Sequence, residues 1–415
     1  MQNELFESAF VPKAYMKLAL PVVLSMMVSL VYNMVDTYFI ALTGKQELVA
    51  GVSLAAPIFT LMIAFGDIFG LGGSSLISRL FGEKREEEAK RASAFCLWAA
   101  IGFGIFVTIV LLVFRTPILK LLGTDAATFE YAGEYYTWIA VGAASIILGL
   151  VPSNILRTEG LATQAMAGSI LGSIVNIILD LVLVLGFKMG VLGVAVATLI
   201  AQGISAVLVS VALMYHTAGL KLIPREIRIH KSVLKNMLAI GLPTGIESSM
   251  YSISNVIVQA ALNGFGVDTM AAWAAFGKID SLFWMINSAF GIAATTFVGQ
   301  NFGAGKMDRV RKGTRECLGM ALVTAILLSV ILMSAGRFLF GIFTTDANVV
   351  EIGLSMMQII SPTYFLFVFI EVYSGALRAQ GHVIVTTAMT MIGICVLRVV
   401  WVTWIVPDGT LSQIV

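Results

Sequence analysis

The stretch SLVYNMVDTYFIALTG, residues 29–44, decides the fold, because it places one carboxylate, Asp36, inside an otherwise apolar run. A charged side chain near the centre of a membrane helix costs roughly 2.5–3.5 kcal/mol on insertion scales, so such residues usually face a protein interior or a water-filled path. The stretch therefore predicts a membrane helix that carries a functional carboxylate.

The composition of the whole chain agrees with a membrane protein. Of its 415 residues, 58% are hydrophobic and 12% are charged, whereas soluble domains carry about 25% charged residues. Apolar runs of about 20 residues, long enough to cross a ~30 Å hydrocarbon core, recur along the sequence. The three cysteines lack ligand-like spacing, which indicates neither a disulfide framework nor a metal site. We predict an all-α polytopic membrane protein.

Charged residues, Gly and Pro divide the chain into eleven predicted helices. These span residues 14–43, 48–79, 92–114, 127–151, 163–187, 190–214, 233–262, 269–300, 315–340, 349–377 and 383–405.

Lys and Arg are concentrated in the N-terminal tail and after the even-numbered predicted helices, as at 79–91, 221–235 and 306–315. The positive-inside rule assigns these segments to the cytoplasm. The chain is therefore predicted to be a multi-pass protein of the cell (inner or plasma) membrane with a cytoplasmic N-terminus. Because the same bias explains the basic clusters, we expect no nucleic-acid partner.

An internal repeat divides the chain into two halves. SRLFGEKREEEAKR at 78–91 resembles GQNFGAGKMDRVRK at 299–312, and LALP at 18–21 resembles IGLP at 240–243. Such a period indicates two homologous six-helix bundles related by an axis along the membrane normal. We predict an N-terminal lobe at 1–220, a cytosolic linker to about 232, and a C-terminal lobe at 233–415. Only five helices of the second lobe are predicted, so a twelfth helix is expected to be absent from this chain.

These features resemble the multidrug and toxic compound extrusion (MATE) family, in a superfamily (MOP) that also contains lipid-linked saccharide flippases. The resemblance is carried by TTFVGQNFGAGKMDRVRKG at 295–313 and by VDTYFIALTG at 35–44, which leads into VAGVSLAAP. It implies two six-helix lobes around a cleft and no cofactor. It also implies export of bulky, often cationic organic compounds in exchange for H+ or Na+.

Four polar residues of the first half form a candidate cation site. Asn176 and Asp180 share one helix face, and helical rise places Asp36, Asp180 and Thr198 each about 12 Å inside the outer boundary. Two nearby carboxylates in a low dielectric can hold a proton, whereas Asp, Asn and Thr oxygens also suit Na+. Both ions therefore remain open. The set resembles the first-lobe site of archaeal and DinF-like members.

Further residues are expected to contribute to transport. Tyr135 and Asn154 are expected to join the first-lobe site, and Pro21 matches the family's first-helix proline, which permits bending. In the second half, Glu247, Lys278 and Asp280 are intramembrane charges on adjacent helices. For these charges, a structural ion pair and the handling of substrate or ion are both open.

We therefore expect a cation-coupled secondary active exporter that works by alternating access, functions as a monomer, and has small organic molecules and the lipid bilayer as its partners. A lipid-linked saccharide flippase is the alternative. An enzyme is not expected, because no metal motif such as HExxH occurs and the only histidines, His216, His230 and His382, occupy or border cytosolic segments.

Overall fold

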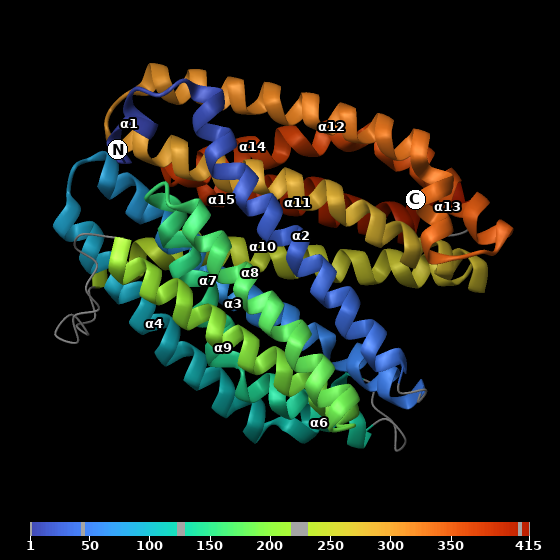
Figure 1. Ribbon diagram of the computed structural model, residues 1–415. Coiled ribbons are helices and arrows are strands. Elements are labelled where there is room, and N and C mark those ends of the chain that lie inside the picture. Colours follow the sequence, from blue (N-terminus) through green and yellow to red (C-terminus); the bar gives the residue numbers. More distant parts are fainter. Residues whose placement is uncertain (1, 43–45, 123–128, 217–230, 406–408, 415) are drawn as a thin grey trace. The chain divides into compact units, whose positions relative to one another are not determined.

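The computed structural model describes residues 2–42, 46–122, 129–216, 231–405 and 409–414. Every regular element within these ranges is helical (Figure 1). The side chains of residues 36–57 lie outside the described part, so the helix around Asp36 is described by its backbone alone. The predicted all-α fold class is confirmed.

Within its described residues, the first half of the chain contains nine α-helices and one π-helical turn. They are α1 (Gln2–Glu7), α2 (Val11–Leu42), α3 (Gln46–Gly82), α4 (Glu86–Val113), α5 (Arg115–Leu121), α6 (Phe129–Val141), α7 (Ala143–Thr158), α8 (Ala162–Asp180), η1 (Leu181–Gly186) and α9 (Gly190–His216).

The second half repeats this pattern of long helices. It contains α10 (Lys231–Asn263), α11 (Val267–Gly303), α12 (Met307–Phe343), α13 (Ala347–Ile360), the 3-10 turn η3 (Ser361–Thr363), α14 (Tyr364–Gln380), α15 (Val383–Thr390), the π-helical η4 (Met391–Val396), α16 (Leu397–Val400), the π-helical η5 (Trp401–Ile405) and α17 (Leu411–Ile414).

Within the described ranges, nine helical segments are long and apolar enough to cross a membrane. A tenth is added if α6 and α7, which are bent by 48° at a break between them, count as one span. The sequence predicted one helix here, at 127–151. The α10 helix is as long as the others but carries the polar stretch SSMYSISN at 248–255. Each of the eleven predicted helices has a counterpart in the structure.

The chain packs as two compact units. The first unit is Leu20–Gly245, and the second unit is Asn3–Ala19 together with Ile246–Val415. The divisions between the units fall inside helices α2 and α10, beside Pro21 and just after Pro243. Each of these helices therefore begins in one unit and ends in the other.

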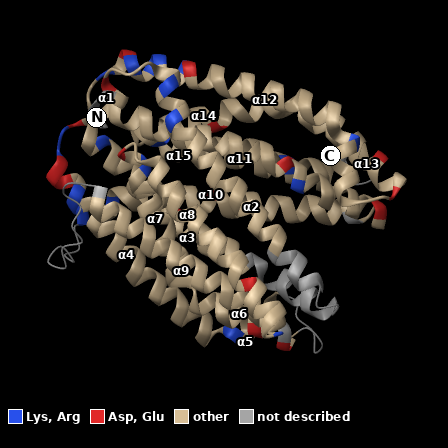
Figure 2. Ribbon diagram, viewed as in Figure 1, with Lys and Arg blue, Asp and Glu red and all other residues tan. Residues whose placement is uncertain are grey.

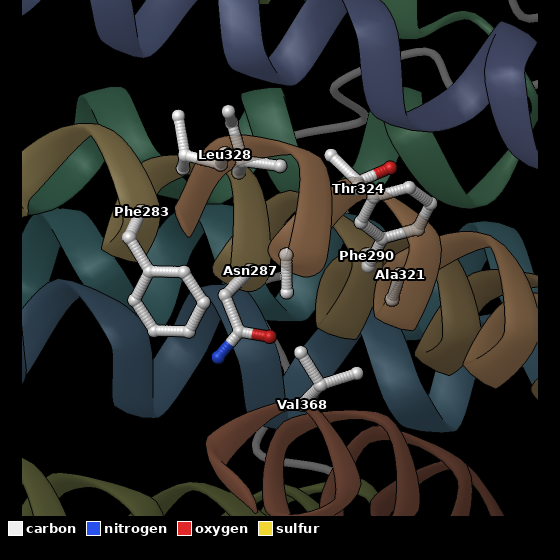
Figure 3. A pocket seen from close by; sticks show the side chains of 9 residues that line it. Phe283, Asn287, Phe290, Ala321, Thr324, Leu328 and Val368 are labelled. Atoms are coloured by element: carbon white, nitrogen blue, oxygen red, sulfur yellow. The ribbon is translucent and has the colours of Figure 1, made fainter. Parts of the chain in front are cut away.

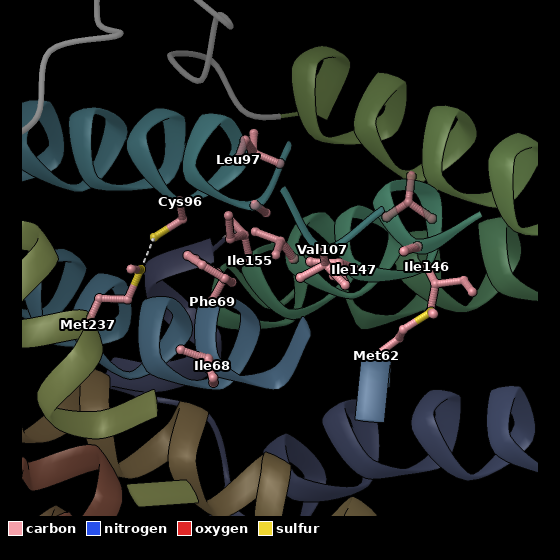
Figure 4. Close-up of a cluster of buried hydrophobic side chains, with 14 of the residues drawn as sticks. Met62, Ile68, Phe69, Cys96, Leu97, Val107, Ile146, Ile147, Ile155 and Met237 are labelled. Atoms are coloured by element: carbon pink, nitrogen blue, oxygen red, sulfur yellow. Dashed lines mark hydrogen bonds between the residues drawn. The ribbon is translucent and has the colours of Figure 1, made fainter. Parts of the chain in front are cut away.

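The first unit has an apolar core in which α3, α4 and α7 meet. Met62, Phe69, Ile147 and Ile155 belong to it, as Figure 4 shows. Small residues bring the helices close, because a Cβ added at Gly104 of α4 lies 2.6 Å from the Cα of Ala144 on α7. Such packing fixes the helices that present the polar residues described below.

The sequence repeat is visible in the backbone. In the first unit α3 packs along α7, and in the second unit the equivalent helices α11 and α14 pack in the same way. The turns that follow α3 and α11 also share a left-handed residue, with φ of 59° at Lys84 and 70° at Gly305. These two positions are 221 residues apart, as the sequence repeat requires.

Candidate functional site

Helix α8 carries two of the predicted site residues on its buried face. Asn176 is 1% exposed and Asp180 is 0% exposed. Their spacing of four residues places both on one side of the helix. A buried carboxylate needs a counter-charge, a proton or hydrogen-bond donors. The structure therefore places these side chains where a cation or proton can be held.

Thr198 of α9 faces the same place. The amide nitrogen of Asn176 lies 3.5 Å from the hydroxyl oxygen of Thr198, and the Asn176 amide oxygen has no hydrogen-bond partner among the described residues. An oxygen that is buried without a donor is available to a cation. The structure thus brings together Asn176 and Thr198, as the sequence predicted.

Asp36 of α2, the fourth predicted residue of the site, has a side chain outside the described residues. Its backbone position follows from a contact one turn away, where Gln202 of α9 donates to the Tyr32 hydroxyl of α2 at 3.4 Å. These helices run in opposite directions (Figure 1). One turn beyond Tyr32 is position 36, and one turn before Gln202 is Thr198, so helical periodicity sets both positions at similar depth.

A π-helical turn begins directly after Asp180. The amide of Phe187 donates to the carbonyl of Val182, five residues earlier, at 2.9 Å. Such turns are frequent at functional sites, where they redirect neighbouring side chains. The second unit has a π-helical turn, η5, at the equivalent place, with Trp401 at the position that corresponds to Asp180. Sequence periodicity gave no signal of either turn.

The remaining first-half candidates lie on other helices. Pro21 lies inside α2 as expected, and Tyr135 is half-buried on α6. Asn154 is buried on α7, where its amide oxygen accepts from the Arg157 guanidinium at 3.2 Å. A Cβ at Gly70 lies 2.6 Å from the Asn154 amide nitrogen, so Asn154 fills the space against α3.

In the second unit, Asp280 is held by two aromatic donors. Its carboxylate accepts from the Tyr364 hydroxyl at 2.5 Å and from the Trp284 indole at 2.8 Å. The Phe283 ring stacks on Tyr364 with centroids 3.9 Å apart. Lys278 is exposed, and no described carboxylate lies within salt-bridge distance of it. Of the two alternatives left open, the ion pair of Asp280 with Lys278 is not formed, and Tyr364 and Trp284 donate to the Asp280 carboxylate instead.

Two further acids of the second unit are close enough to influence one another. Glu247 accepts from the Thr387 hydroxyl at 3.2 Å. Glu371 of α14 packs against Gly291 of α11, whose missing side chain leaves room for the carboxylate. The carboxylates of Glu247 and Glu371 interact electrostatically. Arg398 of α16 donates to the Asn255 amide oxygen at 2.8 Å.

Asn287 lines a small cavity in the second unit (Figure 3). The cavity has a volume of about 10 Å³, lies among α11, α12 and α14, and is lined also by Phe283, Phe290 and Thr324. Both polar atoms of the Asn287 amide are buried without a hydrogen-bond partner among the described residues. An amide placed in this way suits bound water. Sequence reasoning missed this residue.

Glu159 was also missed. It lies in the turn between α7 and α8 and is only 4% exposed, and its Oε1 has no hydrogen-bond partner within the described part of the chain. Burial raises the pKa of this carboxyl from 4.5 to about 8. The repeat offered one signal, because LRTEG at 156–160 matches LRAQG at 377–381, where a neutral Gln380 stands in place of the acid.

The sequence profile of the MatE family matches residues 21–182 and again residues 243–404. Both matches begin at a proline, Pro21 and Pro243. The chain belongs to the MatE family.

Relatives similar in sequence along most of the chain are named as multidrug export proteins. The Multidrug export protein MepA of Staphylococcus saprophyticus is 24% identical over 398 residues, which cover 96% of this chain and 88% of that protein. MepA of Staphylococcus aureus is 25% identical over 379 residues, which cover 91% and 83%. The chain is thus a MatE-family protein similar to transporters, and the prediction that it is not an enzyme is confirmed.

Solved structures share the fold. A MOP superfamily transporter from Pyrococcus furiosus superposes with a TM-score of 0.92 at 22% identity, covering 100% of this chain and 92% of that one. A multidrug resistance MATE family transporter in an outward-facing conformation gives 0.92 at 23% identity, covering 99% and 91%. The MatE fold of this chain, together with its nine candidate spans, makes it a multi-pass membrane protein.

Proposed function

We propose that this MatE-family chain is a secondary active exporter of drugs and other amphipathic, often cationic organic compounds, driven by the inward movement of H+ or Na+. The proposal rests on one observation above all. In this chain, the oxygen-bearing side chains of Asn176, Asp180 and Thr198 are buried in the first unit. The chain belongs to the MatE family, and its relatives are named as multidrug export proteins.

In this proposal the coupling ion binds among Asp36, Asn176, Asp180 and Thr198. The Asn176 amide oxygen and the Thr198 hydroxyl supply neutral oxygens, and the carboxylates supply negative charge. One proton shared between two carboxylates neutralises them at low cost, and Na+ accepts the same oxygens as ligands. Neither ion is selected by this donor set, so the experiment below includes both gradients.

Transport in this proposal proceeds by alternating access of two repeated lobes, residues 1–220 and 233–415, in a single chain. Pro21 removes one backbone hydrogen bond from α2 and allows the helix to bend when the ion binds. Figure 2 shows Lys and Arg gathered near the turns after α3 and α11, while the middles of the helices carry few charges. This distribution supports a cytoplasmic N-terminus.

The test is efflux of ethidium from proteoliposomes with an imposed pH gradient or an imposed Na+ gradient. We expect the parent protein to respond to one gradient. Asp36→Asn and Asp180→Asn are expected to lose at least about tenfold of the gradient-driven rate, because each removes a negative ligand. Asp308→Asn, which changes an exposed acid in the first turn of α12, is the matched control.

Two outcomes contradict the proposal. Efflux that both Asp→Asn variants retain at the control rate places coupling elsewhere. A parent protein that shows no gradient-driven efflux of organic cations but moves a fluorescent isoprenoid-linked saccharide between leaflets is a flippase.

A further inference from the structure

The motif at 295–313 has a structural partner at the other end of the chain. The Arg309 guanidinium donates to the carbonyl of Phe6 at 2.6 Å and to the carbonyl of Ala9 at 2.7 Å. Nearby, the Lys306 ammonium lies 3.3 Å from the Glu7 carboxylate. The Phe6 carbonyl lies in the last turn of α1 and the Ala9 carbonyl lies just beyond it. Helix geometry leaves carbonyls unpaired at such an end and favours a cation there.

Aromatic rings pack around the contact between Arg309 and the N-terminal segment. The Phe297 ring lies under the Arg309 guanidinium at 5.3 Å and 4.9 Å from the Tyr15 ring. Phe6, Tyr15 and Phe297 are each at most 2% exposed. The start of α2 also buries one apolar stripe, formed by Val11, Ala14, Tyr15 and Leu18. The first residues of the chain are thus a packed part of the second unit.

The start of α2 also contacts α12 in the second unit, and the start of α10 makes the equivalent contact with α4 in the first unit. Tyr15 at the start of α2 lies beside the Cys317 thiol of α12, although the two do not form a well-shaped hydrogen bond. At the equivalent positions, the Met237 sulfur of α10 lies 3.6 Å from the Cys96 sulfur of α4 (Figure 4). The start of each repeat's first helix therefore packs against the third long helix of the other repeat.

The two repeats differ in what holds this contact. At the positions equivalent to Lys306 and Arg309, the first repeat has Arg85 and Glu88, which pair with one another at 2.6 Å. Arg85 also pairs with Glu83. In the turn after α3, the charged side chains therefore pair with one another. In the turn after α11, Lys306 and Arg309 bind the N-terminal segment instead.

We infer that Arg309 is a positioning residue for transport, and that it holds residues 6–9 so that the start of α2 moves as part of the second unit. The division between units falls at Ala19 and Leu20, beside Pro21. The remainder of α2, with Asp36, belongs to the first unit. A helix anchored at one end in each unit transmits ion binding at position 36 to the second unit only while its start stays fixed.

This inference rests on the proposed function for its transport consequence, but the anchoring itself can be measured without transport. Spin labels are placed at Phe10→Cys and Phe338→Cys, two exposed sites of the second unit, in protein reconstituted in nanodiscs. The native cysteines Cys96, Cys317 and Cys395 are buried, which limits background labelling. The parent is expected to give one narrow distance distribution that stays the same between pH 5 and pH 8.

Arg309→Ala is expected to broaden this distribution, because it removes both charge-assisted hydrogen bonds. Arg309→Lys, which keeps the charge but loses the forked geometry, is expected to fall between the two. Arg311→Ala changes an exposed residue of the same helix turn and is the matched control. A distribution that is already broad in the parent, or that Arg309→Ala leaves narrow, overturns the inference.

The transport readout separates positioning from folding. Arg309→Ala is expected to lower gradient-driven ethidium efflux by about tenfold while leaving ethidium affinity within about twofold, because the lost hydrogen bonds hold the N-terminal segment and involve none of the proposed ion-site residues. Arg311→Ala is expected to match the parent. If efflux falls only in proportion to the loss of monodisperse protein, the role is structural and the inference fails. Absence of efflux in the parent contradicts the proposed function but leaves the spin-label result to decide the anchoring.

Discussion

Glu159 is a single residue whose burial makes the stability of the protein depend on pH. Its pKa is about 8 in the folded protein against an ordinary value of 4.5. Between these values the folded state keeps a proton that the unfolded state releases, so the free energy of unfolding falls as pH rises. Below about 4.5 both states are protonated, and above about 8 both are ionised, so the dependence disappears outside this window.

Glu159→Gln is therefore expected to raise the melting temperature of purified protein relative to the parent. The advantage should grow between pH 4.5 and 8 and level off above 8, with a size of a few kcal/mol at most, since each pKa unit corresponds to about 1.4 kcal/mol. Thermal unfolding at several pH values measures it. Glu134→Gln, at an exposed acid of α6, is the control. Parallel curves for the parent and Glu159→Gln are the result that contradicts this account.

Single residues also show what a sequence reveals about a membrane site. Asp180 and Asn176 stood out because a polar side chain in an apolar run is costly. Glu159 lies in a turn, where an acid is ordinary, so only its burial in the structure distinguishes it. Asp280 was identified as a candidate, but its partners Tyr364 and Trp284 were not. Tyr364 lies 84 residues away in the chain, and hydropathy reports depth rather than neighbours.

At the scale of helices, glycine sets how closely α11 and α14 approach. A Cβ added at Gly375 lies 2.5 Å from the carbonyl oxygen of Gly291 and 3.2 Å from the Thr295 hydroxyl. That hydroxyl also donates across the same interface to the Gly375 carbonyl at 3.1 Å. The contacts of Glu371 with Gly291 and of Asp280 with Tyr364 also join α11 and α14. The spacing of the two helices therefore sets the distances in these contacts.

Gly375→Ala is expected to destabilise the protein by about 1–3 kcal/mol, because backbone atoms rather than a flexible side chain oppose the added methyl group. The measurement is thermal unfolding of purified protein. Gly319→Ala on α12 is the matched control, since a Cβ there meets nothing within 4 Å. It is expected to be neutral or slightly stabilising. Equal melting temperatures for the two variants would show that α11 and α14 separate without cost.

The sequence predicted the membrane helices but not the irregular places within them. Long apolar runs predicted the membrane helices, because hydrocarbon-spanning helices must satisfy their own backbone. The 48° bend between α6 and α7 and the π-helical turns η1 and η5 were not predicted. The break at Gly142 and the hydrogen bond from Phe187 to Val182 within η1 do not alter the hydropathy pattern.

For the whole molecule, repetition carries most of the information that the sequence holds. The offset of the repeat predicted two related halves, and the MatE profile matches twice, beginning at Pro21 and Pro243. The repeat did not predict that the start of α2 packs in the second unit and the start of α10 in the first unit. It depends on contacts such as that of Arg309 with Phe6, which join residues 303 positions apart in the chain.

The same contact links the orientation of the N-terminus to that of the turn after α11. Because Arg309 holds the carbonyls of Phe6 and Ala9, residues 6–9 and the turn at 304–306 lie on one side of the membrane. In the proposed orientation this side is the cytoplasmic one. The turn at 344–346, at the other end of the 37-residue helix α12, is then expected to be extracellular.

Substituted cysteines test this orientation in intact cells with a membrane-impermeant maleimide. Thr345→Cys, at an exposed position, is expected to react in intact cells, and Ala304→Cys only after permeabilisation. The buried native cysteines keep the parent unlabelled, which serves as the control. The opposite pattern would invert the whole chain. Since the 304–306 turn and residues 6–9 are joined by Arg309, it would also place the N-terminus outside and reverse the direction of ion movement through the Asp36 and Asp180 site.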